Sequence, residues 1–132
     1  MGKVNRINVV FLYVLNMEKS RQFYEAAFDL GVPVVDAKWW VEYAVGDGSH
    51  LALHKIDETH GKQASLGSGA VRFSFEVDDI HEYTEKLKKL GTIFRSEPRQ
   101  EYGFWLAEFE DPEGNAIRLY QKAGKTKAAG DA

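Results

Sequence analysis

The strongest constraint in this sequence is that its second half repeats the pattern of its first half. Each half opens with an apolar stretch rich in Val, Ile, Phe and Tyr, which predicts a β-strand. A cap residue, Asn16 or Asp79, then precedes an apolar stripe at helical spacing that ends in Leu-Gly. Further strand and hairpin signals follow, and GSHLAL at 48–53 corresponds to GNAIRL at 114–119. The repetition predicts two βαβββ halves, with chance similarity between two ordinary α+β stretches as the alternative.

These signals also give expected boundaries for each element. The helix after Asn16 is expected to end at a Gly31 C-cap, and the helix after Asp79 at Gly91. Asp79 and Glu82 form a capping box, in which each side chain accepts a hydrogen bond from the other's backbone N–H. The expected strands cover 7–14, 32–35, 39–45, 50–55, 71–77, 92–95, 104–108 and 116–120.

The length of 132 residues suits a single domain. We expect this domain to span 4–121, with repeat halves of about 4–56 and 70–121. The polar stretch 57–69 is expected to be a loop. The tail 122–132 has no apolar face and is expected to be disordered.

Composition excludes several kinds of function. A net charge of −3 without a block of like charges argues against a nucleic-acid partner. The absence of cysteine excludes disulfides and thiolate metal sites. No apolar run reaches the roughly 20 residues that span a bilayer, so no membrane partner is expected. The first apolar run lacks a small-residue cleavage site and leads into a helix signal, so we expect a strand rather than a signal peptide, and a cytoplasmic location.

Three stretches of the sequence resemble the vicinal oxygen chelate superfamily, which contains glyoxalases, bleomycin resistance proteins and extradiol dioxygenases. These stretches are FLYVLNMEKSRQFYEAAFDLG, FSFEVDDIHEYTEKLKKLG and, most specifically, YGFWLAEFEDPEGNAIRLYQ. The resemblance implies an α+β fold in which tandem βαβββ modules form a curved, mixed-sheet cup. It also implies a homodimer in which residues of both copies complete each cup.

In this superfamily four side chains that face the cup hold a divalent metal ion, and they are usually His, Gln or Glu. The resemblance places these positions at Val9, Ala52, Arg72 and Arg118. Val and Ala carry no donor atom, and a protonated guanidinium has no lone pair to give. We therefore predict no metal ion at the usual site and no other cofactor.

An atypical metal site is the alternative. His50 or His54 could bind a metal ion together with Glu42 or Glu76. Four residues of a strand separate the two histidines by roughly 13 Å, so both cannot bind one ion.

Strand alternation assigns side chains to two faces of the sheets. The face covered by helices is expected to hold Leu12, Val14, Leu51, Leu53, Phe73, Phe75, Ile117 and Leu119. The opposite face supplies the candidate ligand-binding residues Phe11, Tyr13, Trp40, Glu42, His50, His54, Arg72, Glu76, Arg118 and Tyr120. The aromatic side chains among them offer stacking area for a flat ligand, unless they merely fill the cup. Trp39 and Trp105, at equivalent positions of the repeat, are expected in the core or at a dimer interface instead.

Arg72 and Arg118 occupy equivalent positions of the repeat and are expected to lie close together. Two nearby guanidinium charges repel, so they need negative charge between them. Glu42 and Glu76 could supply it in a structural network, or a ligand carboxylate or phosphate could supply it through bidentate hydrogen bonds.

Three functions follow as hypotheses. The first is a metal-independent binding protein of the glyoxalase/bleomycin-resistance type that sequesters a small aromatic or anionic molecule. The second is a lyase- or isomerase-type enzyme with an atypical metal, or with Glu42, Glu76, Tyr13 or a histidine as the acid–base group. The third is a structural or regulatory dimer domain.

Overall fold

The computed structural model describes residue 3 and residues 5–57, 72–101 and 103–122. Most of the expected loop at 57–69 and of the expected tail at 122–132 lies outside these residues. The chain divides into two compact units, Met1–Leu66 and Gly67–Ala132.

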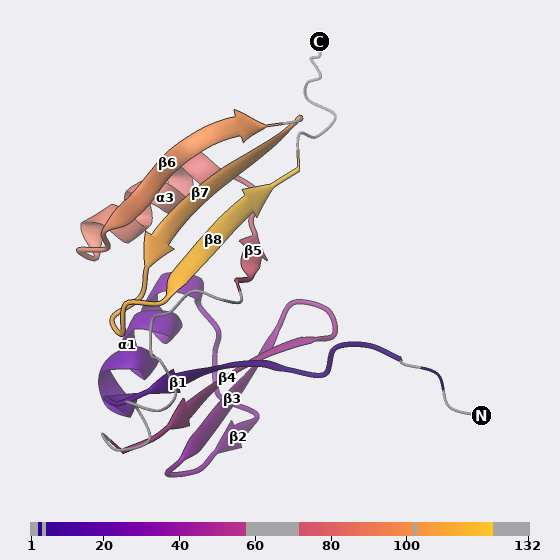
Figure 1. The fold of residues 1–132 in the computed structure, drawn as a ribbon, viewed down its shortest axis with the longest axis vertical. Coiled ribbons are helices and arrows are strands. Elements are labelled where there is room, and N and C mark those ends of the chain that lie inside the picture. The colour runs from indigo at the N-terminus through magenta and orange to yellow at the C-terminus, as the bar shows by residue number, and fades with distance from the viewer. Residues whose placement is uncertain (1–2, 4, 58–71, 102, 123–132) are drawn as a thin grey trace. The chain divides into compact units, whose positions relative to one another are not determined.

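Each unit contains one four-stranded mixed sheet and one described helix (Figure 1). The first unit consists of β1 (Val10–Val14), α1 (Met17–Phe28), β2 (Val35–Asp36), β3 (Trp40–Val45) and β4 (Ser49–Lys55). Its strand order is β1-β4-β3-β2, with β1 parallel to β4 and the other neighbours antiparallel.

The second unit repeats this arrangement. It consists of β5 (Ser74–Glu76), α3 (Ile80–Lys89), β6 (Phe94–Glu101), β7 (Phe104–Glu110) and β8 (Ala116–Gln121). Its strand order is β5-β8-β7-β6, with β5 parallel to β8 and the other neighbours antiparallel. The shared order confirms the predicted α+β fold built from two βαβββ modules.

Helix α1 begins where the sequence predicts but ends earlier. The side chain of Asn16 caps it by accepting a hydrogen bond from the Lys19 backbone N–H at 3.0 Å. The helix stops at Phe28 because Asp29 turns into the left-handed conformation, with φ of 51°. The expected C-cap at Gly31 is therefore wrong by two residues. Asp is one of the few side chains that tolerate this conformation, so no glycine is needed there.

Helix α3 ends where the sequence predicts. Asp79 accepts a hydrogen bond from the Glu82 N–H at its start. At its end, Gly91 adopts φ of 87° and the Thr92 N–H reaches back to the Leu87 carbonyl at 3.0 Å. This is a Schellman motif, which favours glycine at the left-handed position. None of the helices in the described ranges is long and apolar enough to cross a membrane.

The helices cover one face of each sheet, as strand alternation predicts. Six of the eight side chains expected on that face are buried: Val14, Leu51, Leu53, Phe75, Ile117 and Leu119. The other two, Leu12 and Phe73, are half-buried. From α1 the core receives Tyr24 and Ala27, and from α3 it receives Ile80 and Leu87. The opposite face of each sheet, here named the open face, is the one on which a ligand site was expected.

Strand β6 differs most from the prediction. The strand expected over 92–95 instead runs from Phe94 to Glu101 and so includes residues 97–99. Its register against β7 shifts between Phe94 and Ser96 and again between Ser96 and Arg99. Because β6 is an edge strand and irregular here, Pro98 can occupy it without breaking the sheet.

Candidate functional site

The open face of the first unit carries a cluster of four rings, which we name the aromatic cluster: Phe11, Tyr13, Trp40 and His54. Phe11 lies 5.2 Å from Trp40, 5.7 Å from Tyr13 and 5.9 Å from His54, measured between ring centroids. His54 lies 5.6 Å from both Tyr13 and Trp40. These separations suit tilted and edge-to-face contacts between aromatic rings. Strand pairing brings the rings together, because His54 of β4 lies opposite both Tyr13 of β1 and Trp40 of β3.

Ala52 explains how rings from two non-adjacent strands can touch. It lies in β4 between Phe11 of β1 and Glu42 of β3. Its side chain is a single methyl group, and Phe11 contacts Trp40 across this strand. Ala52 is fully buried although it belongs to the open face. Ala52, which the family resemblance implied as a metal-ligand position, therefore has no exposed surface in this chain.

Glu42 is held between two donors beside the aromatic cluster. Its Oε1 accepts a hydrogen bond from the Trp40 indole nitrogen at 2.9 Å, and its Oε2 contacts Nδ1 of His50. The hydrogen bonds from His50 and Trp40 lower the pKa of the Glu42 carboxyl below its usual range. Glu42 is thus an ionised carboxylate that fixes both partners, and it is a weak proton acceptor.

The described residues do not bring enough donor side chains together to hold a metal ion. No group of three or more His, Cys, Asp or Glu side chains among these residues could hold one. His50 has Glu42 beside it, and His54 lies among aromatic rings. The expected atypical site would need a third donor from elsewhere.

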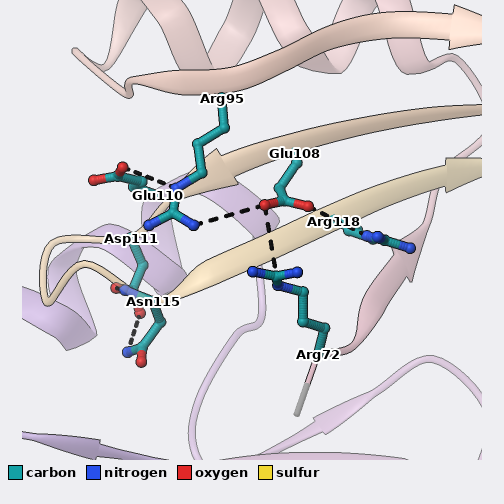
Figure 2. A network of polar contacts seen from close by, with 7 residues as sticks. All are labelled: Arg72, Arg95, Glu108, Glu110, Asp111, Asn115 and Arg118. Atoms are coloured by element: carbon teal, nitrogen blue, oxygen red, sulfur yellow. Dashed lines mark hydrogen bonds and ion pairs between the residues drawn. The ribbon is translucent and has the colours of Figure 1, made fainter. Parts of the chain in front are cut away.

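The open face of the second unit carries three arginines around one carboxylate (Figure 2). We name these residues, Arg72, Arg95, Glu108 and Arg118, the arginine cluster. The Glu108 carboxylate lies 3.3 Å from Nε of Arg118, 3.8 Å from Nη1 of Arg95 and 4.0 Å from Nε of Arg72. Only the Arg118 contact is a hydrogen bond. Arg95 also donates from Nε to Glu110 at 2.9 Å.

Glu108 was missed by the sequence analysis, which assigned the neutralising role to Glu42 and Glu76. Glu76 instead pairs with Lys122 at 3.7 Å, and both Glu42 oxygens are engaged by His50 and Trp40. Counting back from the turn at 111–115 pairs Glu108 with Arg118 across the β7–β8 hairpin. That count needs only the sequence, so the sequence could have identified Glu108 as the partner of Arg118.

The turn between β7 and β8 sets this register. Asp111 is buried, and its carboxylate accepts hydrogen bonds from the backbone N–H groups of Glu113 and Asn115 and from the Asn115 side chain, at 2.8–3.0 Å. Figure 2 shows Asp111 and Asn115 together in this turn. Gly114 adopts φ of 87°, and its N–H donates to the Asp111 carbonyl. The DPEGN stretch is therefore a structural motif that places Glu108 opposite Arg118.

The remaining expected residues have different surroundings. Tyr120 is half-buried against the ring of Phe104, at 5.4 Å between centroids. Trp39 is not a core residue, because 49% of it is exposed and the ammonium groups of Lys38 and Lys55 lie over its ring. Trp105 is half-buried against His81. A role for either tryptophan in a dimer interface stays a prediction.

Comparisons with known proteins agree with the fold described above. The model of the Glyoxalase/Bleomycin resistance protein/Dioxygenase superfamily matches residues 6–119. The uncharacterized protein YetH of Bacillus subtilis is 31% identical over 122 residues, covering 88% of this chain and 98% of that protein. A lactoylglutathione lyase of Neisseria meningitidis serogroup A is 30% identical, covering 89% and 91%. Among solved structures, TnmS3, an antibiotic binding protein from Streptomyces sp. CB03234, shares the fold with a TM-score of 0.71 and 23% identity, covering 92% and 99%.

Proposed function

Since the chain belongs to the Glyoxalase/Bleomycin resistance protein/Dioxygenase superfamily, we propose that it binds a small, flat aromatic molecule without the help of a metal ion. The observation that carries this proposal is the aromatic cluster on the open face of the first unit. Phe11 and Tyr13 remain 44% and 37% exposed there, beside the rings of Trp40 and His54. Exposed apolar surface that is grouped in this way is typical of a binding site.

The aromatic cluster is also held in place before any ligand arrives. The Glu42 carboxylate fixes the indole of Trp40 through its nitrogen, and Ala52 leaves room for Phe11 to contact that indole. A rigid ring surface loses little conformational entropy when it stacks on a ligand, which favours binding. TnmS3, an antibiotic binding protein with the same fold, supports this class of function.

Binding without a metal ion is supported by the residues at the four positions where the family resemblance implies metal ligands. Val9 and Ala52 offer no donor atom, and Arg72 and Arg118 bring positive charge. Binding should therefore survive treatment with a chelator. A stoichiometric metal ion whose removal abolishes binding would contradict the proposal.

A screen of flat aromatic compounds by thermal shift, followed by calorimetric titration, tests the binding itself. For the compound that binds best, Trp40→Leu should weaken the affinity at least about tenfold, because it removes the largest ring of the cluster. The adjacent Trp39→Leu is the matched control, since Trp39 lies outside the cluster, and it should leave the affinity unchanged. Equal losses in the two variants would refute the assignment of the site.

A second candidate function is an acid–base enzyme, and one contact favours it. When Nδ1 of His50 donates to Glu42, Nε2 is left to accept a proton from a bound molecule. The relative named lactoylglutathione lyase makes lactoylglutathione a natural first substrate to assay. Turnover that His50→Gln abolishes and His54→Gln preserves would establish this function, whereas turnover lost equally in both variants would exclude His50 as the base.

A further inference from the structure

The arginine cluster of the second unit has more positive charge than its own carboxylates neutralise. We propose that it binds the oxyanion of a small ligand, a carboxylate or a phosphate, with Arg72 and Arg118 as the principal donors. This inference goes beyond the proposed function, because it concerns a separate anion site in the second unit. All the contacts that support it lie within that unit.

The charges do not balance locally. The guanidinium groups of Arg72, Arg95 and Arg118 all lie within 4.0 Å of Glu108, and among the described residues Glu110 is the only other carboxylate that pairs with any of them, through Arg95. Three positive charges therefore face two negative ones. Glu76, which the sequence analysis expected to neutralise these arginines, is instead engaged by Lys122 at 3.7 Å. An anion bound beside Glu108 would remove the excess.

The hydrogen-bonding groups are also incompletely used. A guanidinium has five N–H donors. Within the described residues, Arg118 and Arg95 donate hydrogen bonds only from Nε, to Glu108 and Glu110, and Arg72 makes only a 4.0 Å ion pair. The terminal amino groups thus remain available, and these are the groups that bind a carboxylate or phosphate in a bidentate manner.

Glu108 is the residue that all three arginines of the cluster contact. Its side chain is only 16% exposed, whereas the three arginine side chains are 37–42% exposed. The carboxylate therefore lies beneath the arginines and draws them together, and their outer edges face solvent. This is the arrangement of a preformed anion site, in which the repulsion among the cations has been met during folding.

Titration with bare anions tests the inference separately from the proposed function. Inorganic phosphate and acetate, neither of which has an aromatic ring, are each added to the full chain at low ionic strength. The arginine Nε–H resonances are followed by NMR. We expect saturable shifts of the Arg72 and Arg118 signals with at least one anion, and the anion that binds tells phosphate from carboxylate.

Substitutions then assign the site. Arg72→Gln should weaken the binding of that anion at least about fivefold. Arg72 precedes β5 and takes no part in the sheet pairing, so this variant is expected to fold even if Arg118→Gln does not. Arg99→Gln is the control, because it removes the same charge from the same sheet where Arg99 pairs with Glu101.

Two results would overturn the inference. One is the absence of any saturable shift with either anion up to about 10 mM, a concentration at which even weak sites fill. The other is an equal loss of affinity in Arg99→Gln and Arg72→Gln, which would mean that only net charge matters. If uncharged aromatic compounds still bind in either case, the proposed function stands and the anion site alone fails.

Discussion

Replacing Glu108 with Gln tests how the arginine cluster is held together. The substitution keeps the shape of the side chain and removes its charge. The three guanidinium groups that lie 3.3, 3.8 and 4.0 Å from the carboxylate then face one another without an anion between them. We expect the variant to fold, because Glu108 lies on the open face and not among the core residues, but to be less stable.

The size of the effect follows from the distances and the exposure. At about 4 Å and an effective dielectric constant of about 20, Coulomb's law gives roughly 4 kcal/mol per pair as an upper bound. The arginines are more than a third exposed, so solvent and salt reduce each pair to about 0.2–1 kcal/mol. Three such pairs, one of them hydrogen-bonded, give a loss of about 2 kcal/mol in the free energy of unfolding. For a chain of this length that corresponds to a fall in Tm of about 6–10 °C.

Urea unfolding at low and high salt measures this loss. The difference between parent and variant should be largest at low salt and should shrink as added salt screens the repulsion among the arginines. Glu97→Gln is the matched control, because Glu97 pairs with only one cation, Lys88, at 2.8 Å on the surface. It should change the midpoint much less than Glu108→Gln does. If Glu108→Gln unfolds at the same urea concentration as the parent at low salt, the electrostatic account of the arginine cluster is wrong.

Three further predictions concern the turn, the first unit and the assembly. Asp111→Ala should cost about 1–3 kcal/mol in urea unfolding, because it leaves two half-buried N–H groups of the β7–β8 turn without their acceptor, and Asp111→Asn should cost less. The lowered pKa of Glu42 means that its ionised form stabilises the fold above the ordinary carboxyl pKa of 4.5. The stability difference between the parent and Glu42→Gln should therefore be constant near neutral pH and shrink as the pH falls below 4.5; a difference that grows on acidification would contradict this. Light scattering should detect a homodimer. A monomer at high protein concentration would contradict the predicted homodimer.

The fold could be predicted from the sequence because its signals are local. Caps at Asn16 and Asp79, the glycine at the end of α3 and the DPEGN turn each specify a boundary through a hydrogen bond or a positive φ. Strand β6 was misassigned because Pro98 ordinarily argues against a strand. Its tolerance here depends on an edge position and on register shifts, and neither is visible in a single stretch of sequence.

The candidate site could be predicted only in part. Strand alternation found the rings of the aromatic cluster and both repeat-equivalent arginines, since alternation depends only on the strand period. Alternation alone does not tell which carboxylate each arginine meets, because that also requires the register between neighbouring strands, which for Glu108 and Arg118 a count from the DPEGN turn would have supplied. Arg95 was missed as well. It lies on β6, whose irregular pairing with β7 could not be derived from sequence periodicity.

The methyl group of Ala52 has a consequence for engineering this sheet. A larger side chain introduced there would have to displace the ring of Phe11, which contacts that of Trp40 across this strand. Any donor atom placed at this position would therefore have to be accompanied by changes in the ring packing. Steric packing, and not only the chemistry of the side chain, thus controls what position 52 can accept.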